Sequence, residues 1–202
     1  ERIYEYSCSQ PEKDAIIIDK CYTYKDLWDR TVDCVKMLNE SVGERDNVLI
    51  KADFTLDFII NMFAISILKA VVVPYSRDIS ENNLNGLKKE LGAYEINELN
   101  RKEVDYDVND FPTENDSHMI LYTTGTTGKK KGVLHTYRSS IYTYYKYAYG
   151  PGINNETKML ISLPLNHGNG LRHLETVLYN GGTCILLPET YDLKKMFFLC
   201  RQ

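Results

Sequence analysis

The sequence predicts an α/β protein with mixed, largely parallel sheets flanked by helices. Short apolar runs, such as Asn47–Ala52 and the β-branched Val71–Val73, alternate along the chain with longer segments of helical periodicity. Apolar strands that alternate with helices favour a parallel or mixed sheet covered on both faces.

The composition is that of a globular protein and disfavours several other classes. Of the 202 residues, 43% are hydrophobic and 26% are charged, which is sufficient for a sizeable core. The net charge of −4 gives no electrostatic case for nucleic acid as a partner. No apolar run reaches the roughly 20 residues of a membrane span, and no signal peptide is recognisable.

The cysteines point to a reducing compartment. They are odd in number and show neither a C-x-x-C pair nor metal-ligand spacing. We therefore expect free thiols and a cytoplasmic protein. These cysteines are Cys8, Cys21, Cys34, Cys184 and Cys200.

In the first half of the chain, helix starts are marked by capping residues. Thr23 with Asp26 predicts a capping box, and Ser80 predicts the cap of a helix that runs to about Leu91. Between them we expect a strand over Asn47–Ala52, an apolar helix over Thr55–Ile67, and a strand over Val71–Val73 that Pro74 ends. The residues expected to face the core are Leu27, Thr31, Val35 and Leu38 in the first helix and Leu56, Ile59, Ile60, Phe63 and Ile67 in the apolar one.

The segment Arg101–Ser117 interrupts this rhythm. It contains six acidic residues and Pro112. We interpret residues 101–117 as a solvated surface connection rather than a functional site.

The alternation then resumes with a strand over His118–Tyr122. Gly181-Gly182 is typical of a left-handed helix cap. The further elements expected are helices over Arg138–Tyr149, Leu171–Tyr179 and from Asp192 to Gln202, and strands over Lys158–Leu163 and Thr183–Leu187.

Tyrosines cluster between residues 137 and 149. They could stack on bases or sugars, or they could pack inside the protein. We favour packing, because Tyr142, Tyr145 and Tyr149 fall on one helical face and could lie against a sheet.

The stretch Leu121–Gly132 reads L-Y-T-T-G-T-T-G-K-K-K-G and has the chemistry of a phosphate-binding loop. Its glycines allow a tight backbone whose N–H groups converge on an anion, and its threonines and lysines add hydroxyl and charged donors. It is not a Walker A motif, because Gly125 and Gly128 are too close and Lys130 replaces Ser or Thr. A plain surface loop and a generic basic patch are the alternatives.

Residues Tyr122–Val133 resemble the signature Y-T-S-G-T-T-G-K-P-K-G-V of the adenylate-forming superfamily, matching at ten of twelve positions. This superfamily contains acyl- and aryl-CoA ligases, luciferases and peptide-synthetase adenylation domains. The departure that matters is Lys130 for proline, which removes a constraint on φ. Further resemblances are Tyr22–Leu27 to L-T-Y-x-E-L, Ala64–Pro74 to A-x-x-x-x-G-x-x-x-V-P with Lys69 for glycine, Leu163–Leu171 to L-P-L-F-H-x-x-G-L, and Gly181–Leu187 to G-G-T-x-V-L-x.

The resemblance implies an AMP-forming ligase that converts a carboxylic acid to an acyl-adenylate with ATP and then transfers the acyl group to a thiol, most simply that of coenzyme A. Mg²⁺ would bridge the phosphate oxygens. The alternatives are a carrier-protein thiol as acceptor, or a non-catalytic nucleotide-binding relative. The residues implied for the β- and γ-phosphates of ATP are Thr123, Thr124, Gly125, Thr126, Thr127, Gly128, Lys129 and Lys131.

The resemblance also places His167 at the acyl-substrate pocket, although a lone histidine can equally be structural. Asn166 stands where an aromatic residue is usual, so the pocket wall is expected to be more polar or more open. No aspartate occurs between Leu163 and Leu171, which disfavours an α-amino acid as substrate.

Later family elements, including Y-G-x-T-E, a ribose-binding aspartate and a lid lysine, are not found in the sequence. We therefore expect residues 1–202 to be the N-terminal part of the large domain without the C-terminal lid, and to be inactive in isolation. No catalytic residue is assigned within them, and the metal ligands are left open.

Overall fold

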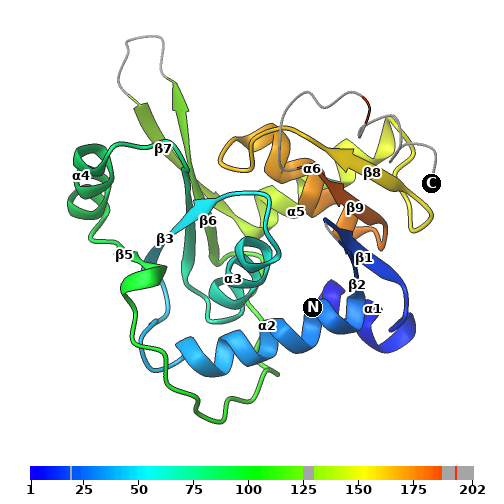
Figure 1. Ribbon diagram of the computed structural model, residues 1–202, viewed down its shortest axis with the longest axis horizontal. Coiled ribbons are helices and arrows are strands. Elements are labelled where there is room, and N and C mark those ends of the chain that lie inside the picture. Colours follow the sequence, from blue (N-terminus) through cyan, green and yellow to red (C-terminus); the bar gives the residue numbers. More distant parts are fainter. Residues whose placement is uncertain (19, 125–129, 188–193, 195–202) are drawn as a thin grey trace. The chain divides into compact units, whose positions relative to one another are not determined.

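The structure is a computed structural model that describes residues 1–18, 20–124, 130–187 and 194 (Figure 1). The chain forms two compact units. The first consists of residues 1–29, 54–56 and 142–202, and the second of residues 30–53 and 57–141. The expected helix from Asp192 lies outside the described residues apart from Lys194.

The first unit is built on a four-stranded sheet with the order β2-β1-β9-β8. β9 runs parallel to both β1 and β8, whereas β1 and β2 are antiparallel. Helix α6 packs on β8 and β9 and also contacts α1. The elements are α1 Arg2–Ser9, β1 Asp14–Ile17, β2 Cys21–Thr23, β8 Lys158–Ile161, α6 Gly168–Tyr179 and β9 Thr183–Leu186.

The second unit is built on a five-stranded sheet with the order β5-β3-β4-β6-β7. All neighbouring strands are parallel except β6 and β7, which form an antiparallel hairpin. Two helices divide their length between the units, namely α2 Tyr24–Leu38 and α5 Tyr137–Tyr149, and the first residue of a third, Leu56 of α3, also belongs to the first unit. The other elements are β3 Asn47–Ala52, α3 Leu56–Ile67, β4 Val71–Ser76, α4 Glu81–Leu91, β5 Tyr94–Glu95, the 3-10 helix Ile96–Glu98, β6 Ser117–Thr124 and β7 Lys130–Thr136.

The predicted fold class is confirmed, and so are the capped helix starts at Thr23 and Ser80, whereas α6 begins at Gly168 rather than at the predicted Leu171. The Thr23 N–H donates to Asp26 Oδ2 at 2.9 Å and the Asp26 N–H donates to Thr23 Oγ1 at 3.0 Å, which is a capping box. The Asn83 N–H donates to Ser80 Oγ at 3.4 Å. After α6, Gly181 has φ of 77° and the Gly182 N–H donates to the Val177 carbonyl at 2.9 Å, as in a left-handed cap.

Two predictions are wrong: that Pro74 ends its strand, and that Phe63 is a core residue of α3. β4 continues through Pro74 to Ser76, because proline is compatible with extended backbone and the recorded β4–β6 pairing lies earlier, at Val72. Phe63 is only half-buried, whereas Phe58 and Met62 are buried, because α3 is covered on most of its circumference. The four predicted core residues of α2 are all buried.

The tyrosine prediction is also wrong. Tyr142, Tyr145 and Tyr149 are 63%, 57% and 91% exposed. The buried side chains of α5 in the first unit are Tyr144 and Ala148, which are four residues apart on a different helical face.

Residues 101–116 contain neither helix nor strand, and their acidic side chains are mostly exposed. The Lys69 ammonium forms a 2.5 Å ion pair with Asp110 in this connection. Lys69 itself has φ of 57°, a left-handed conformation that glycine adopts without strain.

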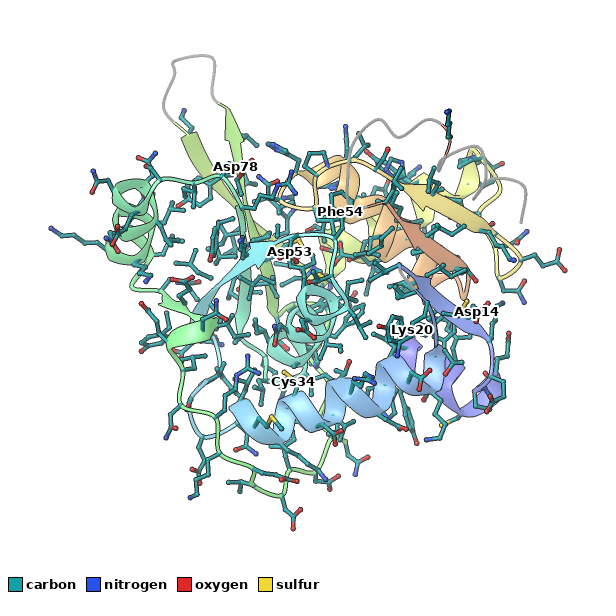
Figure 2. The ribbon with its side chains drawn as sticks, in the orientation of Figure 1. Asp14, Lys20, Cys34, Asp53, Phe54 and Asp78 are labelled. Atoms are coloured by element: carbon teal, nitrogen blue, oxygen red, sulfur yellow. The ribbon has the colours of Figure 1, made fainter. Side chains whose placement is uncertain are left out.

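Free thiols are present in both units. The cysteines Cys8, Cys21, Cys34 and Cys184 are unpaired. Cys34 lies on α2 (Figure 2), where its Sγ donates to Asn61 Oδ1 at 3.2 Å. Within the described part of the chain, no helix is both long and apolar enough to cross a membrane.

Candidate functional site

The phosphate-loop segment lies in the second unit, between the two strands of the β6–β7 hairpin (Figure 1). Thr124 is the last residue of β6 and pairs with Lys130, the first residue of β7. The five residues between them, Gly125 to Lys129, lie outside the described residues. The strand before the loop was predicted, whereas β7 was not.

Two of the predicted phosphate-binding residues are brought together by this pairing. Thr123 and Lys131 are cross-strand partners, and both are exposed. The Thr123 hydroxyl donates to the Lys131 carbonyl at 3.5 Å, so it makes only a weak internal bond. A hydroxyl donor and an ammonium group therefore stand together at the end of the hairpin next to the loop, where an anion could contact both.

The hairpin is closely packed at Gly132. A Cβ atom at this position would lie 3.0 Å from Ile120 Cγ2 and 3.2 Å from Tyr122 Cζ on the paired strand. Ile120 and Tyr122 also pack against the buried cluster of Leu49, Val73, Tyr75 and Ala93. Gly132 thus lets β7 approach side chains that are anchored in the sheet.

A strand follows the loop, whereas a helix follows the loop of a Walker A motif. The described element that follows the loop, β7, therefore offers no helix N-terminus to attract an anion. The phosphate-binding role predicted from the sequence therefore depends on backbone N–H groups, threonine hydroxyls and lysines.

The other end of β6 carries a buried polar contact that the sequence did not reveal. His118 Nδ1 lies 2.9 Å from the Ser140 hydroxyl at the start of α5, and its ring stacks on Tyr137 with centroids 4.4 Å apart. Burial lowers the pKa of His118 to about 3, and the nearby His135 adds to this effect. His118 is therefore neutral at pH 7. No spacing in the sequence links residues 118 and 140.

His167, the predicted pocket residue, lies in the first unit at the N-cap of α6. It is exposed, and its side chain makes no capping hydrogen bond. The preceding turn packs tightly on the helix start, because a Cβ at Gly170 would lie 2.4 Å from the Pro164 carbonyl oxygen. The fold thus presents the imidazole of His167 at the beginning of a helix with its ring available for other contacts.

Farther along α6, Glu175 is a buried carboxyl that was not predicted. It is 6% exposed, and burial raises its pKa to about 8, partly opposed by a hydrogen bond with Tyr144 and by the positive charge of Arg172. Glu175 is therefore mostly protonated at neutral pH. Glu175 lies among the buried positions of α6, but a glutamate is rarely buried, so the sequence did not indicate a buried carboxyl here.

Comparison with known proteins places these features in context. A model of the AMP-binding enzyme family matches residues 88–201, a range that contains the hairpin, His167 and Glu175. The chain is 29% identical over 211 aligned residues to a 2-succinylbenzoate–CoA ligase of Bacillus pumilus, an alignment that covers 92% of this chain and 43% of the relative. The chain thus spans less than half the length of this relative.

A shorter alignment concerns the mitochondrial malonate–CoA ligase of Xenopus laevis, which is 40% identical over 72 residues, 35% of this chain and 12% of that protein. Among solved structures, the O-succinylbenzoate CoA synthetase of Bacillus subtilis in complex with ATP and magnesium ion superposes with a TM-score of 0.86. That comparison covers all of this chain and 60% of the other at 19% identity, so it supports the fold.

Proposed function

The chain belongs to the AMP-binding enzyme family, and from that premise we propose that the protein activates a carboxylic acid with ATP. The carboxylate attacks the α-phosphorus, which gives an acyl-adenylate and pyrophosphate, and the acyl group then passes to the thiol of coenzyme A with release of AMP. The observation that carries this proposal is the hairpin that presents Thr123 and Lys131 beside the family's phosphate loop.

The proposed role of the loop is to hold the β- and γ-phosphates. Both reactants of the first step are anions, so positioning and charge neutralisation dominate its barrier. Lys131 would supply charge, and Thr123 a hydroxyl that is only weakly engaged in the free protein. The assignment extends to Thr124, Gly125, Thr126, Thr127, Gly128 and Lys129 on the sequence motif alone.

Mg²⁺ fits this arrangement as an ion carried by the nucleotide. Among the described residues, no group of His, Cys, Asp and Glu is placed to hold a metal ion. Oxygens of the phosphates with water, joined by threonine hydroxyls, are the hard ligands that Mg²⁺ prefers. When bound, it would neutralise developing phosphate charge.

We propose that His167 contacts the carboxylate end of the acid substrate. Its exposure and its lack of a capping bond leave the ring nitrogens for a substrate oxygen. The neighbouring Asn166, half-buried, makes this wall polar. Because the relatives named above act on 2-succinylbenzoate and malonate, acids with a second carboxylate are the first candidates.

The proposal is tested with the complete protein encoded by the gene. A panel of mono- and dicarboxylic acids is screened for ATP-dependent hydroxamate formation, and the best acid is used to measure KM for ATP. Lys131→Met should raise this KM by about 10- to 100-fold, the effect of one charge-assisted hydrogen bond of about 1.5–3 kcal/mol. The matched control is Lys51→Met, an exposed lysine on β3, which should leave it unchanged.

The outcomes separate the alternatives. Coenzyme A consumption with AMP release supports the ligase, whereas acid activation without it would indicate a carrier-protein thiol as acceptor. Nucleotide binding with no acid activated would leave a non-catalytic relative. The 202-residue chain alone is expected to show no acid-dependent ATP–pyrophosphate exchange. We also propose a cytoplasmic location, which the unpaired cysteines support.

A further inference from the structure

The second half of α5 and helix α6 are joined, within the first unit, by a row of polar and aromatic contacts. We propose that Tyr147 on α5 is a positioning residue that holds the first turn of α6 and thereby places His167 for the acid substrate. This inference rests on the proposed function. It gives one tyrosine of the cluster between residues 137 and 149 a role other than stacking on a nucleotide or packing against a sheet.

Tyr147 contacts two residues on one face of α6. Its hydroxyl donates to Asn169 Oδ1 at 3.5 Å, and its ring meets that of His173 edge-on, with centroids 5.5 Å apart and planes at 75°. Asn169 and His173 are four residues apart, so Tyr147 lies along the surface of the first turns of the helix. Edge-to-face aromatic geometry of this kind is favourable.

Other contacts between these helices lie farther from His167. Arg172 Nη1 donates to Thr143 Oγ1 at 3.2 Å, and Tyr144 and Tyr145 both pack against Tyr179 at the far end of α6. Among the described contacts between the two helices, that of Tyr147 with Asn169 is the one that reaches the first turn. Loss of Tyr147 should therefore loosen this turn while the rest of α6 stays docked.

The first turn of α6 needs an external restraint because its own sequence stabilises it poorly. Gly168 and Gly170 both have low helix propensity. His167 provides no side-chain cap, and no acidic residue occurs in the first turn to interact with the helix dipole. His167 thus precedes a turn that is held from outside, by the close packing of Gly170 on the Pro164 carbonyl and by Tyr147, through its ring contact with His173 and a weak 3.5 Å bond to Asn169.

The first test measures positioning directly in the complete protein. Amide hydrogen exchange of residues 171–173, the first N–H groups of α6 that have helical acceptors, should accelerate about three- to tenfold in Tyr147→Ala, the effect of one hydrogen bond and one ring contact. Tyr149→Ala is the matched control, since Tyr149 lies on the same helix and is 91% exposed. Equal exchange in the two variants, or acceleration along the whole of α6, would overturn the inference.

The second test is a double-mutant cycle in the complete protein. Tyr147→Ala should raise KM for the acid about three- to tenfold and leave KM for ATP unchanged, and Tyr147→Phe should fall between it and the wild type. In a His167→Ala background the effect of Tyr147→Ala on KM should disappear, because it acts through His167. Full additivity, or equal changes in both KM values, would refute the positioning role.

These tests separate the two proposals. A wild-type protein that activates no acid would contradict the proposed function, and the exchange experiment would still decide whether Tyr147 holds the turn. An active wild type with an additive cycle would contradict only the role of Tyr147.

Discussion

Replacing Glu175 with glutamine would test whether the buried carboxyl of α6 is neutral in the folded protein. Burial raises its pKa from an ordinary 4.5 to about 8, and the contacts with Tyr144 and Arg172 oppose the rise only in part. Glutamine has nearly the same shape and carries no ionisable proton. The substitution therefore removes the titration while it keeps the packing.

The sign of the pH effect follows from proton linkage. Below pH 4.5 the carboxyl is protonated in both states, and its favourable burial is fully present. Between pH 4.5 and 8 the unfolded chain loses the proton while the folded protein keeps it, so the free energy of unfolding falls as pH rises. At about 1.4 kcal/mol per pKa unit, the loss is about 3 kcal/mol at pH 7 and at most about 5 kcal/mol at pH 8.

The assay is urea unfolding followed by far-ultraviolet circular dichroism at intervals from pH 4.5 to 8.5. Relative to wild type, Glu175→Gln should gain stability progressively as pH rises, up to those amounts. Glu156→Gln, at an exposed position in the same unit, should follow the wild type throughout. If the difference between Glu175→Gln and wild type were constant with pH, Glu175 would be ionised in the folded state and the reasoning would fail.

Three other predictions concern the second unit. Gly132→Ala should lower the free energy of unfolding by about 1–3 kcal/mol, since its Cβ would press on side chains of the facing strand. In the same urea assay, Gly86→Ala should raise it by about 0.5–1 kcal/mol, because Gly86 lies in the middle of α4 with open space around it. Because the pKa of His118 is lowered from 6.5 to about 3, the free energy of unfolding should fall as pH drops below 6.5, and His118→Gln should flatten that acid limb of the urea series. Lys69→Met removes the ion pair with Asp110 in the acidic connection and should speed cleavage of residues 101–116 by a glutamate-specific protease. An unchanged cleavage rate would show that the ion pair does not restrain this connection.

Local signals predicted much of the fold. Thr23, Asp26 and Ser80 mark helix starts through hydrogen bonds between residues three positions apart, so both partners of each bond lie in one short stretch of sequence. The strand over Asn47–Ala52 was predicted with its observed bounds, because it is apolar and lies between turns. Such features need no knowledge of distant parts of the chain.

The elements that were missed depend on partners elsewhere. β7 begins with two lysines and carries the exposed Val133 and Leu134, so it shows no alternation of buried and exposed positions. Its strand conformation comes from pairing with β6. Tyr142, Tyr145 and Tyr149 share a helical face, but which face of α5 is covered depends on α6 and the sheet.

Features of the candidate site also differ in whether the sequence or only the structure revealed them. The motif around Gly125 and the candidate His167 were evident from sequence. The phosphate-binding assignment of residues 123–129 and Lys131 and the pocket role of His167 stay predictions. The pairing of Thr123 with Lys131 and the contact of Tyr147 with Asn169 required the structure.

By itself, then, the sequence determined the fold class, the family and the residue types that would meet ATP and an acid, because these follow from short-range patterns and a contiguous motif. Only the tertiary structure decided that β7 pairs with β6 in a hairpin, that His118 and Glu175 are buried in their neutral forms, and that Tyr147 contacts Asn169 and His173 on α6. The physical reason is that desolvation and side-chain contact are set by segments far apart in the chain, whose approach no local pattern encodes.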